Sequence, residues 1–398
     1  MPSVIIVGGG IIGLATAYQL RRRHPEVQVT LLEKETTVGR HQSSHNSGVL
    51  HAGLYYAPGS LKARLAVSGI REMLAFCRRH GIAHDVCGKV VVATDDSELS
   101  RLRELLLRGQ ANGLQGLRWL SPEQAREIEP HVRCVAAVHV PEEGIVDYAQ
   151  VCRTLAAEII RGGGTIHTGA EVHGFVWDGA AWHVQAADGD HTAQFIITCG
   201  GLHSDRIARM AGARPSVQIV PFRGEYFKLR DGRNTLVRNL VYPVPDPAFP
   251  FLGVHFTRMI SGGVECGPNA VLAFAREGYT NRQVSPRDVL DSLAFPGFWR
   301  FLAKYPGMCS REMWRSFSRA AFCAALQRLV PDVQPDDLVA GGAGVRAQAM
   351  DRSGALVQDF AMIETGNALH LLNAPSPGAT ASLAIGDHLI DRASRAWK

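Results

Sequence analysis

The sequence predicts an α/β fold in which a parallel sheet, assembled from separate parts of the chain, is joined to a region built on a mixed or antiparallel sheet plus helices. Three observations lead to this prediction. A β-branched run near the start leads into a glycine-rich turn and a helix. Apolar runs that resemble buried parallel strands recur at 194–201 and 369–372. Alternating and aromatic segments, broken by prolines, fill residues 217–275.

The composition is that of an ordinary globular protein. Of the 398 residues, 46% are hydrophobic, which supports a sizeable core. The net charge of +5 is spread along the chain without a long basic run, so nucleic acid is not expected as a partner. The 8 cysteines show neither CxxC nor zinc-type spacing, so we expect reduced thiols, no metal site and a cytoplasmic protein. We find no targeting signal and no membrane span.

The N-terminal region is expected to form a βαβ unit. A continuous β-branched strand at 4–7 is followed by a glycine turn and a helix that ends near Arg23. A second strand covers 27–32 and ends at Glu33. This order of elements is typical of a nucleotide-binding unit.

The glycine turn of this unit has the spacing Gly8-x-Gly10-x-x-Gly13. Gly8 permits the tight turn, Gly10 lets a pyrophosphate approach the helix N-terminus, and Gly13 lets helix and strand pack closely. Glu33, 20 residues after Gly13, would accept hydrogen bonds from a ribose. We therefore predict dinucleotide binding, with a purely structural glycine turn as the alternative.

A long irregular segment at 36–60, rich in Gly, Ser, His and Asn, follows Glu33. An NAD enzyme would continue with further short βαβ units. Long loops without structure of their own are usually functional, and this one could run along a cofactor that extends past its adenine half. The segment therefore favours FAD over NAD.

The remaining elements are expected in the following order. We predict a helix at 61–81, a strand at 89–94, a helix at 98–111, a helix start at 121–123, a helix and strand within 144–166, a strand at 194–199, a sheet at 217–275, two helices within 295–330, a strand at 369–372 and a helix to about Ile390. Nucleotide-type segments at the start, middle and end imply a discontinuous cofactor domain. Its expected parts are 1–85, 145–216 and 336–398, and the expected substrate domain comprises 86–144 and 217–335.

Several motifs together resemble the D-amino-acid-oxidase-like flavoprotein superfamily. They are GGGIIGLATAYQL with Glu33, GRHQSSHNSGVLHAGLYYAPGSLKARL, IITCGGLHSD, GGAGVRAQ and LLNAPSPGATASLAIGDHL. HNSGVLHAGLYYAPGSLKA, FLGVHFTR and VECGPNAVLAFAREGY are most similar to its L-2-hydroxyglutarate dehydrogenase/oxidase branch. The resemblance covers nearly the whole chain. It implies noncovalent FAD in a Rossmann-like domain and oxidation of L-2-hydroxyglutarate to 2-oxoglutarate by hydride transfer from C2 to flavin N5. It also implies electron transfer to a quinone-type acceptor or to oxygen.

Oxidation of a 2-hydroxy acid requires a base near the hydroxyl and cations for the carboxylates. The resemblance places His51 at the substrate, so we expect it to be the base, with His255 as the rival. The alternative is that His51 and His45 only bond loop carbonyls. The resemblance also places Arg346 at the substrate carboxylate, where the planar guanidinium suits bidentate binding. Further candidate substrate contacts are Arg258, Lys62, Arg64, Tyr55 and Tyr242.

Other residues are expected to contact the cofactor. Gly378 would allow close backbone approach, and the N–H groups of Ala379 and Thr380 would open a helix whose dipole favours the anionic edge of reduced flavin. The other expected contacts are Ile12, Lys34, Ser43, Ser44, His45, Ser47, Gly48, Val172, Gly200, Gly201 and Gly344.

Two alternatives to this function stay open from the sequence. A related flavoprotein could act on glycerol 3-phosphate or on a secondary amino acid such as sarcosine, since fold does not determine substrate. A nucleotide-binding protein without redox turnover is the other. The segment at 295–307 mixes aromatic and basic residues, which suits either a core-facing helix or peripheral contact with the inner membrane. The oligomeric state is not predicted.

Overall fold

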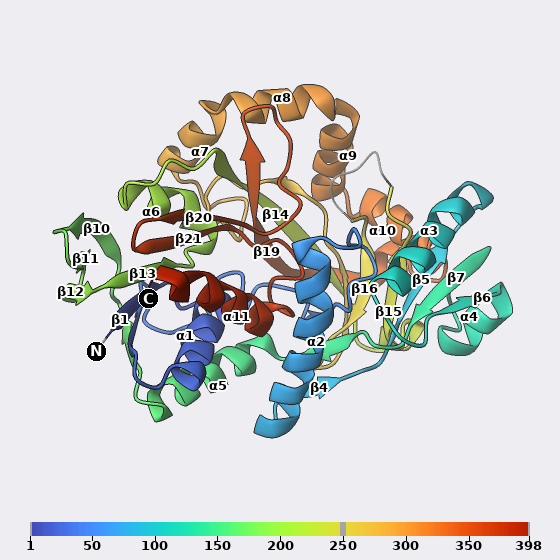
Figure 1. The fold of residues 1–398 in the computed structure, drawn as a ribbon. Coiled ribbons are helices and arrows are strands. Elements are labelled where there is room, and N and C mark those ends of the chain that lie inside the picture. Colours follow the sequence, from blue (N-terminus) through green and yellow to red (C-terminus); the bar gives the residue numbers. More distant parts are fainter. Residues whose placement is uncertain (1, 247–251, 397–398) are drawn as a thin grey trace.

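The computed structural model describes residues 2–246 and 252–396. Residues 247–251, part of the segment expected to form an antiparallel sheet, lie outside the described residues. In Figure 1 the N- and C-terminal elements lie side by side at one end of the molecule, and the elements within residues 89–140 lie at the opposite end. The chain therefore folds around two main sheets.

The first sheet is parallel except at one edge. Its order is β20 (Ala361–Thr365), β21 (Ala368–Asn373), β13 (Phe195–Thr198), β1 (Ser3–Val7), β2 (Gln28–Glu33) and β9 (Thr165–Thr168), and only the β20–β21 pair is antiparallel. Successive residues of β1 face opposite clusters: Val4 and Ile6 pack into one and Ile5 and Val7 into the other. Burial on both faces explains the continuous apolar runs in these strands.

Helices cover one face of this sheet and a small sheet covers the other. The helices are α1 (Ile11–Arg23), α5 (Tyr148–Arg161), α11 (Ser382–Ala393) and, beside α11, α2 (Leu61–His80). The small antiparallel sheet consists of β10 (Val172–Trp177), β11 (Trp182–Ala186) and β12 (Gly189–Ala193). Trp182 and Val184 of β11 are buried together with Ile5 and Leu32. The layered arrangement is that of a nucleotide-binding α/β domain.

The second main sheet is mixed. Its order is β18 (Val271–Leu272), β14 (Val217–Leu229), β17 (Val264–Gly267), β16 (His255–Arg258), β15 (Leu240–Pro243), β5 (Lys89–Ala93), β7 (Ala136–Val140) and β6 (Arg118–Leu120), with β19 (Leu338–Asp351) also paired to β14. Only β15 and β5 run parallel to each other. The long antiparallel β14–β19 pair forms one wall beside the first sheet (Figure 1).

The remaining elements pack around the two main sheets. They are β3 (Val49–Leu50), β8 (Gly144–Val146) and β4 (His84–Asp85) in a small sheet, and the helices α3 (Leu99–Ala111), α4 (Pro122–Ile128), α6 (Ser204–Met210), α7 (Pro286–Leu293), α8 (Pro296–Lys304), α9 (Pro306–Phe317) and α10 (Arg319–Gln327). Helices α7 to α9 lie along the outer edge above β14 and β19 (Figure 1).

The predicted fold class is confirmed, and three details of the expected organisation differ. The segment at 295–330 forms three helices instead of two, because Pro306 opens a new helix and the Ser318 side chain caps the next one. Residues from 336 onward were assigned to the cofactor domain, but β19 pairs along β14 in the second sheet. The last helix begins at Ser382, after the turn that contains Ala379 and Thr380.

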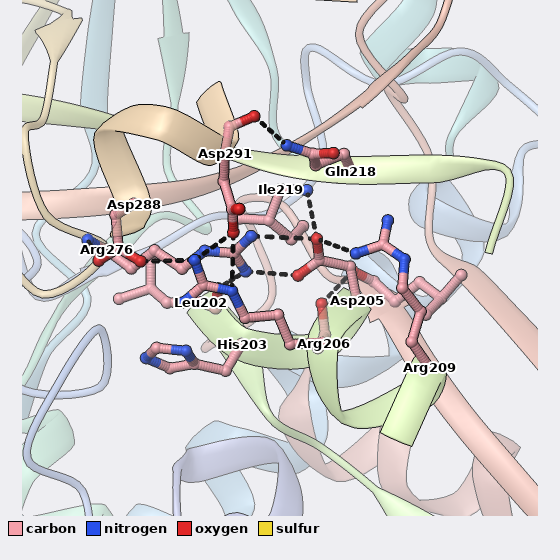
Figure 2. Close-up of polar contacts among 12 residues, drawn as sticks. Leu202, His203, Asp205, Arg206, Arg209, Gln218, Ile219, Arg276, Asp288 and Asp291 are labelled. Carbon is pink, nitrogen blue, oxygen red and sulfur yellow. Dashed lines mark hydrogen bonds and ion pairs between the residues drawn. The ribbon is translucent and has the colours of Figure 1, made fainter. Parts of the chain in front are cut away.

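A buried polar network joins α6 to the segment before α7 (Figure 2). Arg276 forms an ion pair with Asp205 and donates to the Leu202 carbonyl at 2.7 Å. Asp205 also accepts from the backbone N–H of Ile219 at 3.3 Å, at the start of β14. Arg276 and Asp205 are almost fully buried, and a buried pair is tolerated only when its remaining polar atoms are bonded, as they are here. The network therefore holds α6, which packs on the first sheet, against β14 of the second sheet.

Candidate active site

A cavity of about 1040 Å³ lies where the two sheets meet. It is at the upper end of the size range of ligand sites. Its lining comes from the turn between β1 and α1, the irregular segment after β2, the strands β14, β15, β16 and β19, and the turn before α11. Segments distant in the sequence therefore meet around one space.

The glycine turn forms one end of this cavity. Gly8 has a φ of +108°, and a Cβ there would stand 2.5 Å from the Cys199 carbonyl oxygen, so only glycine fits without strain. Gly10 precedes α1 and lines the cavity, and the Ile11 N–H donates to Ser43 Oγ at 2.9 Å. The open N-terminus of α1 is the arrangement that binds a pyrophosphate.

Glu33 lies at the end of β2, as expected for a ribose-binding acid. Its Oε2 accepts from the Gly9 N–H at 2.6 Å and its Oε1 from the Glu35 N–H at 2.8 Å. Each carboxylate oxygen has a second lone pair, so the side chain can still accept from hydroxyl groups. The residues at this end of the cavity therefore fit a dinucleotide.

Gly13 offers a test of the close packing that the glycine motif requires. A Cβ on Gly13 would stand 1.9 Å from the Gly8 carbonyl oxygen, which is backbone and cannot rotate away. Gly13→Ala is expected to cost about 1–3 kcal/mol in unfolding free energy and to reduce the flavin bound per protein chain. Gly342→Ala is the matched control, because a Cβ there meets nothing within 4 Å. Equal melting temperatures and flavin absorbance in both variants would contradict the packing role.

The irregular segment after β2 runs along the cavity as the sequence predicted. The His45 ring stacks on Tyr279 with 4.0 Å between ring centroids, and His45 Nδ1 lies 3.0 Å from the Arg40 carbonyl oxygen. A Cβ on Gly344 of β19 would stand 2.4 Å from the His45 carbonyl oxygen. His45 is therefore held in place by neighbours and lines the cavity beside β19.

The turn before α11 presents backbone donors to the cavity. Gly378, Ala379 and Thr380 all line it. Within the described part of the chain, the N–H groups of Ala379 and Thr380 donate to no protein acceptor. The side chain of Thr380 is bonded to Tyr148 Oη at 2.7 Å and accepts from the His51 N–H at 3.2 Å. The turn therefore offers two free N–H groups to an anion and also holds the backbone of His51.

Most of the predicted cofactor residues line this cavity. Gly13, Ser44 and Gly48 do not. Gly13 lies behind the turn, Ser44 Oγ donates to the Gly39 carbonyl at 2.5 Å, and a Cβ on Gly48 would stand 3.0 Å from the Val146 carbonyl oxygen. The predicted residues that do line it are Gly8, Gly10, Ile12, Glu33, Lys34, Ser43, His45, Ser47, Val172, Gly200, Gly201, Gly344, Gly378, Ala379 and Thr380.

The other end of the cavity carries both predicted histidines. His255 stacks on Tyr242 with 3.8 Å between centroids, and the His51 ring stands edge-on to Tyr242 at 6.4 Å. Burial lowers the pKa of His255 to about 3, and its Nδ1 lies 2.8 Å from the Gly253 carbonyl oxygen. A base works best when its pKa is near the working pH. The lowered pKa therefore counts against His255 as the base at neutral pH.

Two buried charged residues next to His51, Glu143 and Lys89, were not among the predicted site residues. The carboxylate of Glu143 forms an ion pair with Lys89, and its Oε2 lies 3.4 Å from His51 Nδ1. The side chains of Lys89 and Glu143 are 0% exposed. A signal was present in the sequence, since Lys89 is the charged residue that begins the apolar strand KVVVA. Charged side chains are almost never fully buried unless paired, and the partner could not be identified from the sequence.

Arg346 of β19 also lines the cavity. Its side chain is partly buried, and its Nη1 donates to the Asn269 carbonyl at 3.0 Å. A Cβ on Gly224 of β14 would stand 3.0 Å from Nη1 and 3.2 Å from Nη2, so this glycine makes room for the guanidinium. Burial lowers the pKa of Arg346, but a guanidinium stays protonated in proteins.

The other predicted substrate residues divide into two groups. Tyr55, Tyr242 and Lys62 line the cavity. Arg258 does not: it forms an ion pair with Asp85 at the end of β16, and we remove it from the candidate substrate residues.

Helix α8 packs its aromatic side into the protein. Phe298 and Phe301 are buried, and Phe301 contacts Phe222 of β14 with 5.6 Å between centroids. Arg300 and Lys304 are exposed. This is the core-facing alternative for the segment at 295–307. Among the described residues, no helix is both long and apolar enough to cross a bilayer.

Comparisons with known proteins identify the family of this chain. The family model described as FAD dependent oxidoreductase matches residues 3–392. An L-2-hydroxyglutarate dehydrogenase from Indibacter alkaliphilus is 49% identical, with 96% of each chain covered. The L-2-hydroxyglutarate dehydrogenase of Escherichia coli K12 is 44% identical over 98% of this chain and 93% of its own. The human mitochondrial L-2-hydroxyglutarate dehydrogenase is 41% identical over 99% of this chain and 89% of its own.

Solved structures support the fold. An L-alpha-glycerophosphate oxidase from Mycoplasma pneumoniae with FAD bound has a TM-score of 0.79 at 24% identity, with 99% of this chain and 95% of that chain covered. Glycine oxidase from Geobacillus kaustophilus has a TM-score of 0.73 at 21% identity, with 99% and 95% covered. The expected family resemblance is confirmed, as is FAD as the cofactor. The glycine turn, Glu33 and the free N–H groups before α11 fit the dinucleotide. Because the family model matches residues 3–392, the chain belongs to the FAD-dependent oxidoreductases.

Proposed function

We propose that this protein oxidises L-2-hydroxyglutarate to 2-oxoglutarate with noncovalently bound FAD. Relatives named L-2-hydroxyglutarate dehydrogenase, 41% to 49% identical over nearly the whole chain, support this substrate. The observation that carries the proposal is that the residues that fit a dinucleotide line the same cavity as Arg346 and His51. The residues that fit the dinucleotide would hold FAD, which when bound would supply the acceptor for the hydride from C2 of the substrate.

The chain's own residues would prepare the substrate for this step. Arg346 would bind the carboxylate next to C2 through its two guanidinium nitrogens. His51 would take the hydroxyl proton at Nε2, because its Nδ1 faces Glu143. Burial lowers the pKa of His51, so the ring is neutral and able to accept a proton near pH 7. The N–H groups of Ala379 and Thr380 would stabilise negative charge at the cofactor edge.

Lys62 is our candidate for the distal carboxylate, and it gives a prediction about pH. Burial lowers the pKa of Lys62 to about 8, with Asp359 opposing the shift. A lysine with a lowered pKa is cationic below that value and neutral above it. We therefore expect kcat/KM for L-2-hydroxyglutarate to fall as pH rises through about 8, while kcat changes little. In Lys62→Arg the cation persists, so this decline should disappear from a kcat/KM profile. A decline that persists in that variant would exclude Lys62.

The proposed electron acceptor is a quinone or oxygen, with transient contact between the protein and the inner membrane if a quinone is used. Anaerobic reduction followed by admission of air would separate the two. Rapid return of the flavin colour in air would identify an oxidase. Slow return in air, with fast return on addition of a soluble quinone, would identify a quinone-linked dehydrogenase.

Turnover with an artificial dye acceptor tests the proposed substrate. L-2-hydroxyglutarate should support turnover with formation of one 2-oxoglutarate per two electrons. D-2-hydroxyglutarate, glycerol 3-phosphate and sarcosine are the competing donors. Faster turnover with any of these three would reject the proposed substrate while leaving the family assignment intact.

A further inference from the structure

We propose that Glu143 and Lys89 are positioning residues that set the tautomer and the basicity of His51. This inference rests on the proposed function, since it concerns the base for the same hydroxyl. Neither residue lines the cavity, so neither would touch the substrate directly. The residues come from different segments: Lys89 begins β5, and Glu143 precedes β8 in the turn after β7.

The geometry around Glu143 determines how it can act. Its Oε1 lies 3.3 Å from the Ala52 backbone nitrogen, which donates to it. Its Oε2 contacts Lys89 Nζ and lies 3.4 Å from His51 Nδ1. A carboxylate can only accept a hydrogen bond, so Glu143 would favour the tautomer of neutral His51 that carries its proton on Nδ1. The opposite nitrogen, Nε2, then keeps its lone pair for the substrate hydroxyl.

Lys89 explains how a fully buried carboxylate stays ionised. Burial alone would raise the pKa of Glu143, but Lys89 and His51 hold it at about 2. The Lys89 ammonium is also enclosed by two aromatic rings, at 4.7 Å from the Tyr55 centroid and 4.5 Å from the Tyr242 centroid. Faces of aromatic rings attract cations, so these rings help to retain the charge without water.

The two residues act on His51 in opposite directions. Glu143 raises the pKa of His51, because a nearby carboxylate favours the imidazolium that forms when the base takes a proton. Lys89 lowers it, because a nearby cation opposes that charge. The other charged or titratable groups that face His51 are Lys62, Tyr242 and His255. Of these, Lys62 also lowers the pKa of His51.

The inference predicts that two variants shift the pH dependence of flavin reduction in opposite directions. The observable is the limiting rate of anaerobic flavin reduction by L-2-hydroxyglutarate against pH, which rises as the base loses its proton. In Glu143→Gln the rising limb should move to lower pH, and the plateau should fall about 10- to 100-fold, a part of what a positioned base contributes. In Lys89→Met the limb should move to higher pH. Half-saturation should change little in either variant, since Arg346 is untouched.

A double variant separates positioning from support of the fold. Lys89→Met with Glu143→Gln removes both charges, so neither is left buried without a partner, and replacing a buried ion pair is often neutral for stability. A merely structural pair predicts that the double variant recovers the wild-type rate. The inference predicts normal flavin content and melting temperature with a rate that stays low. The inference would be overturned if the double variant recovered the wild-type rate or did not fold. It would also be overturned if the rising limbs of the two single variants moved to the same side of the wild-type pH profile.

The same experiment keeps the two proposals distinguishable. Wild-type protein that L-2-hydroxyglutarate does not reduce would reject the proposed substrate. Wild-type protein that is reduced, with variants whose pH profiles do not separate, would reject only the role of Glu143 and Lys89.

Discussion

His51→Ala is expected to slow flavin reduction by L-2-hydroxyglutarate about 100-fold or more, while FAD stays bound. The magnitude is the usual contribution of a positioned base. Retention of FAD is expected because the His51 side chain contacts Glu143 and Tyr242, whereas the Gly8–Gly10 turn and Glu33 are other parts of the cavity lining and are unchanged. Anaerobic stopped-flow at saturating substrate measures the rate, and the visible flavin band measures FAD content.

His255→Asn is the comparison that makes this result specific. His255 also lines the cavity, but its pKa of about 3 leaves it too weak a base at neutral pH. We therefore expect a smaller loss in His255→Asn than in His51→Ala. A near-normal rate in His51→Ala, or a larger loss in the His255 variant, would transfer the role of base to another group.

Arg346→Lys is expected to raise the half-saturation concentration of L-2-hydroxyglutarate about 10- to 100-fold. Hydrogen bonds to charged groups contribute roughly 1.5–3 kcal/mol, and an ammonium cannot reproduce the two parallel bonds of a guanidinium. The variant keeps the positive charge, so a rise in the half-saturation concentration would be due to loss of the guanidinium geometry and not to a change in net charge. The dependence of the reduction rate on substrate concentration measures it.

Arg258→Lys is the matched control for this substitution. Arg258 pairs with Asp85 outside the cavity lining, so the same exchange there should leave half-saturation unchanged. An unchanged half-saturation in Arg346→Lys, or equal shifts in both variants, would remove Arg346 from substrate binding.

The sequence predicted best those features that depend on neighbouring residues. The strand, glycine turn and helix from Ser3 to Arg23 follow from local pattern, and the structure has them within a residue or two of the expected bounds. Likewise Ser121 caps α4 at the helix start that the sequence predicted, and the structure adds a capping box with Gln124. Pro306 shows the limit, because a single proline between two apolar segments can interrupt one helix or separate two.

Features that depend on sheet register were harder to predict. His255 and Arg258 lie in the same short strand, and Arg258 is the third residue after His255. Because side chains alternate along a strand, these two point to opposite faces of the sheet. His255 therefore reaches the cavity, and Arg258 meets Asp85 of β4. Glu143 and Lys89 are brought together by the pairing of β5 with β7 and by the turn that follows, which no local pattern specifies.

Anaerobic stopped-flow of the wild-type protein tests the central claim most directly. The visible flavin band is followed as L-2-hydroxyglutarate is mixed in, with D-2-hydroxyglutarate and glycerol 3-phosphate in parallel. Rapid bleaching by the L-isomer alone is the predicted result, and it would establish the cofactor, the substrate and its handedness together. A flavin band that the L-isomer leaves unchanged, or that glycerol 3-phosphate bleaches faster, would contradict the proposed function.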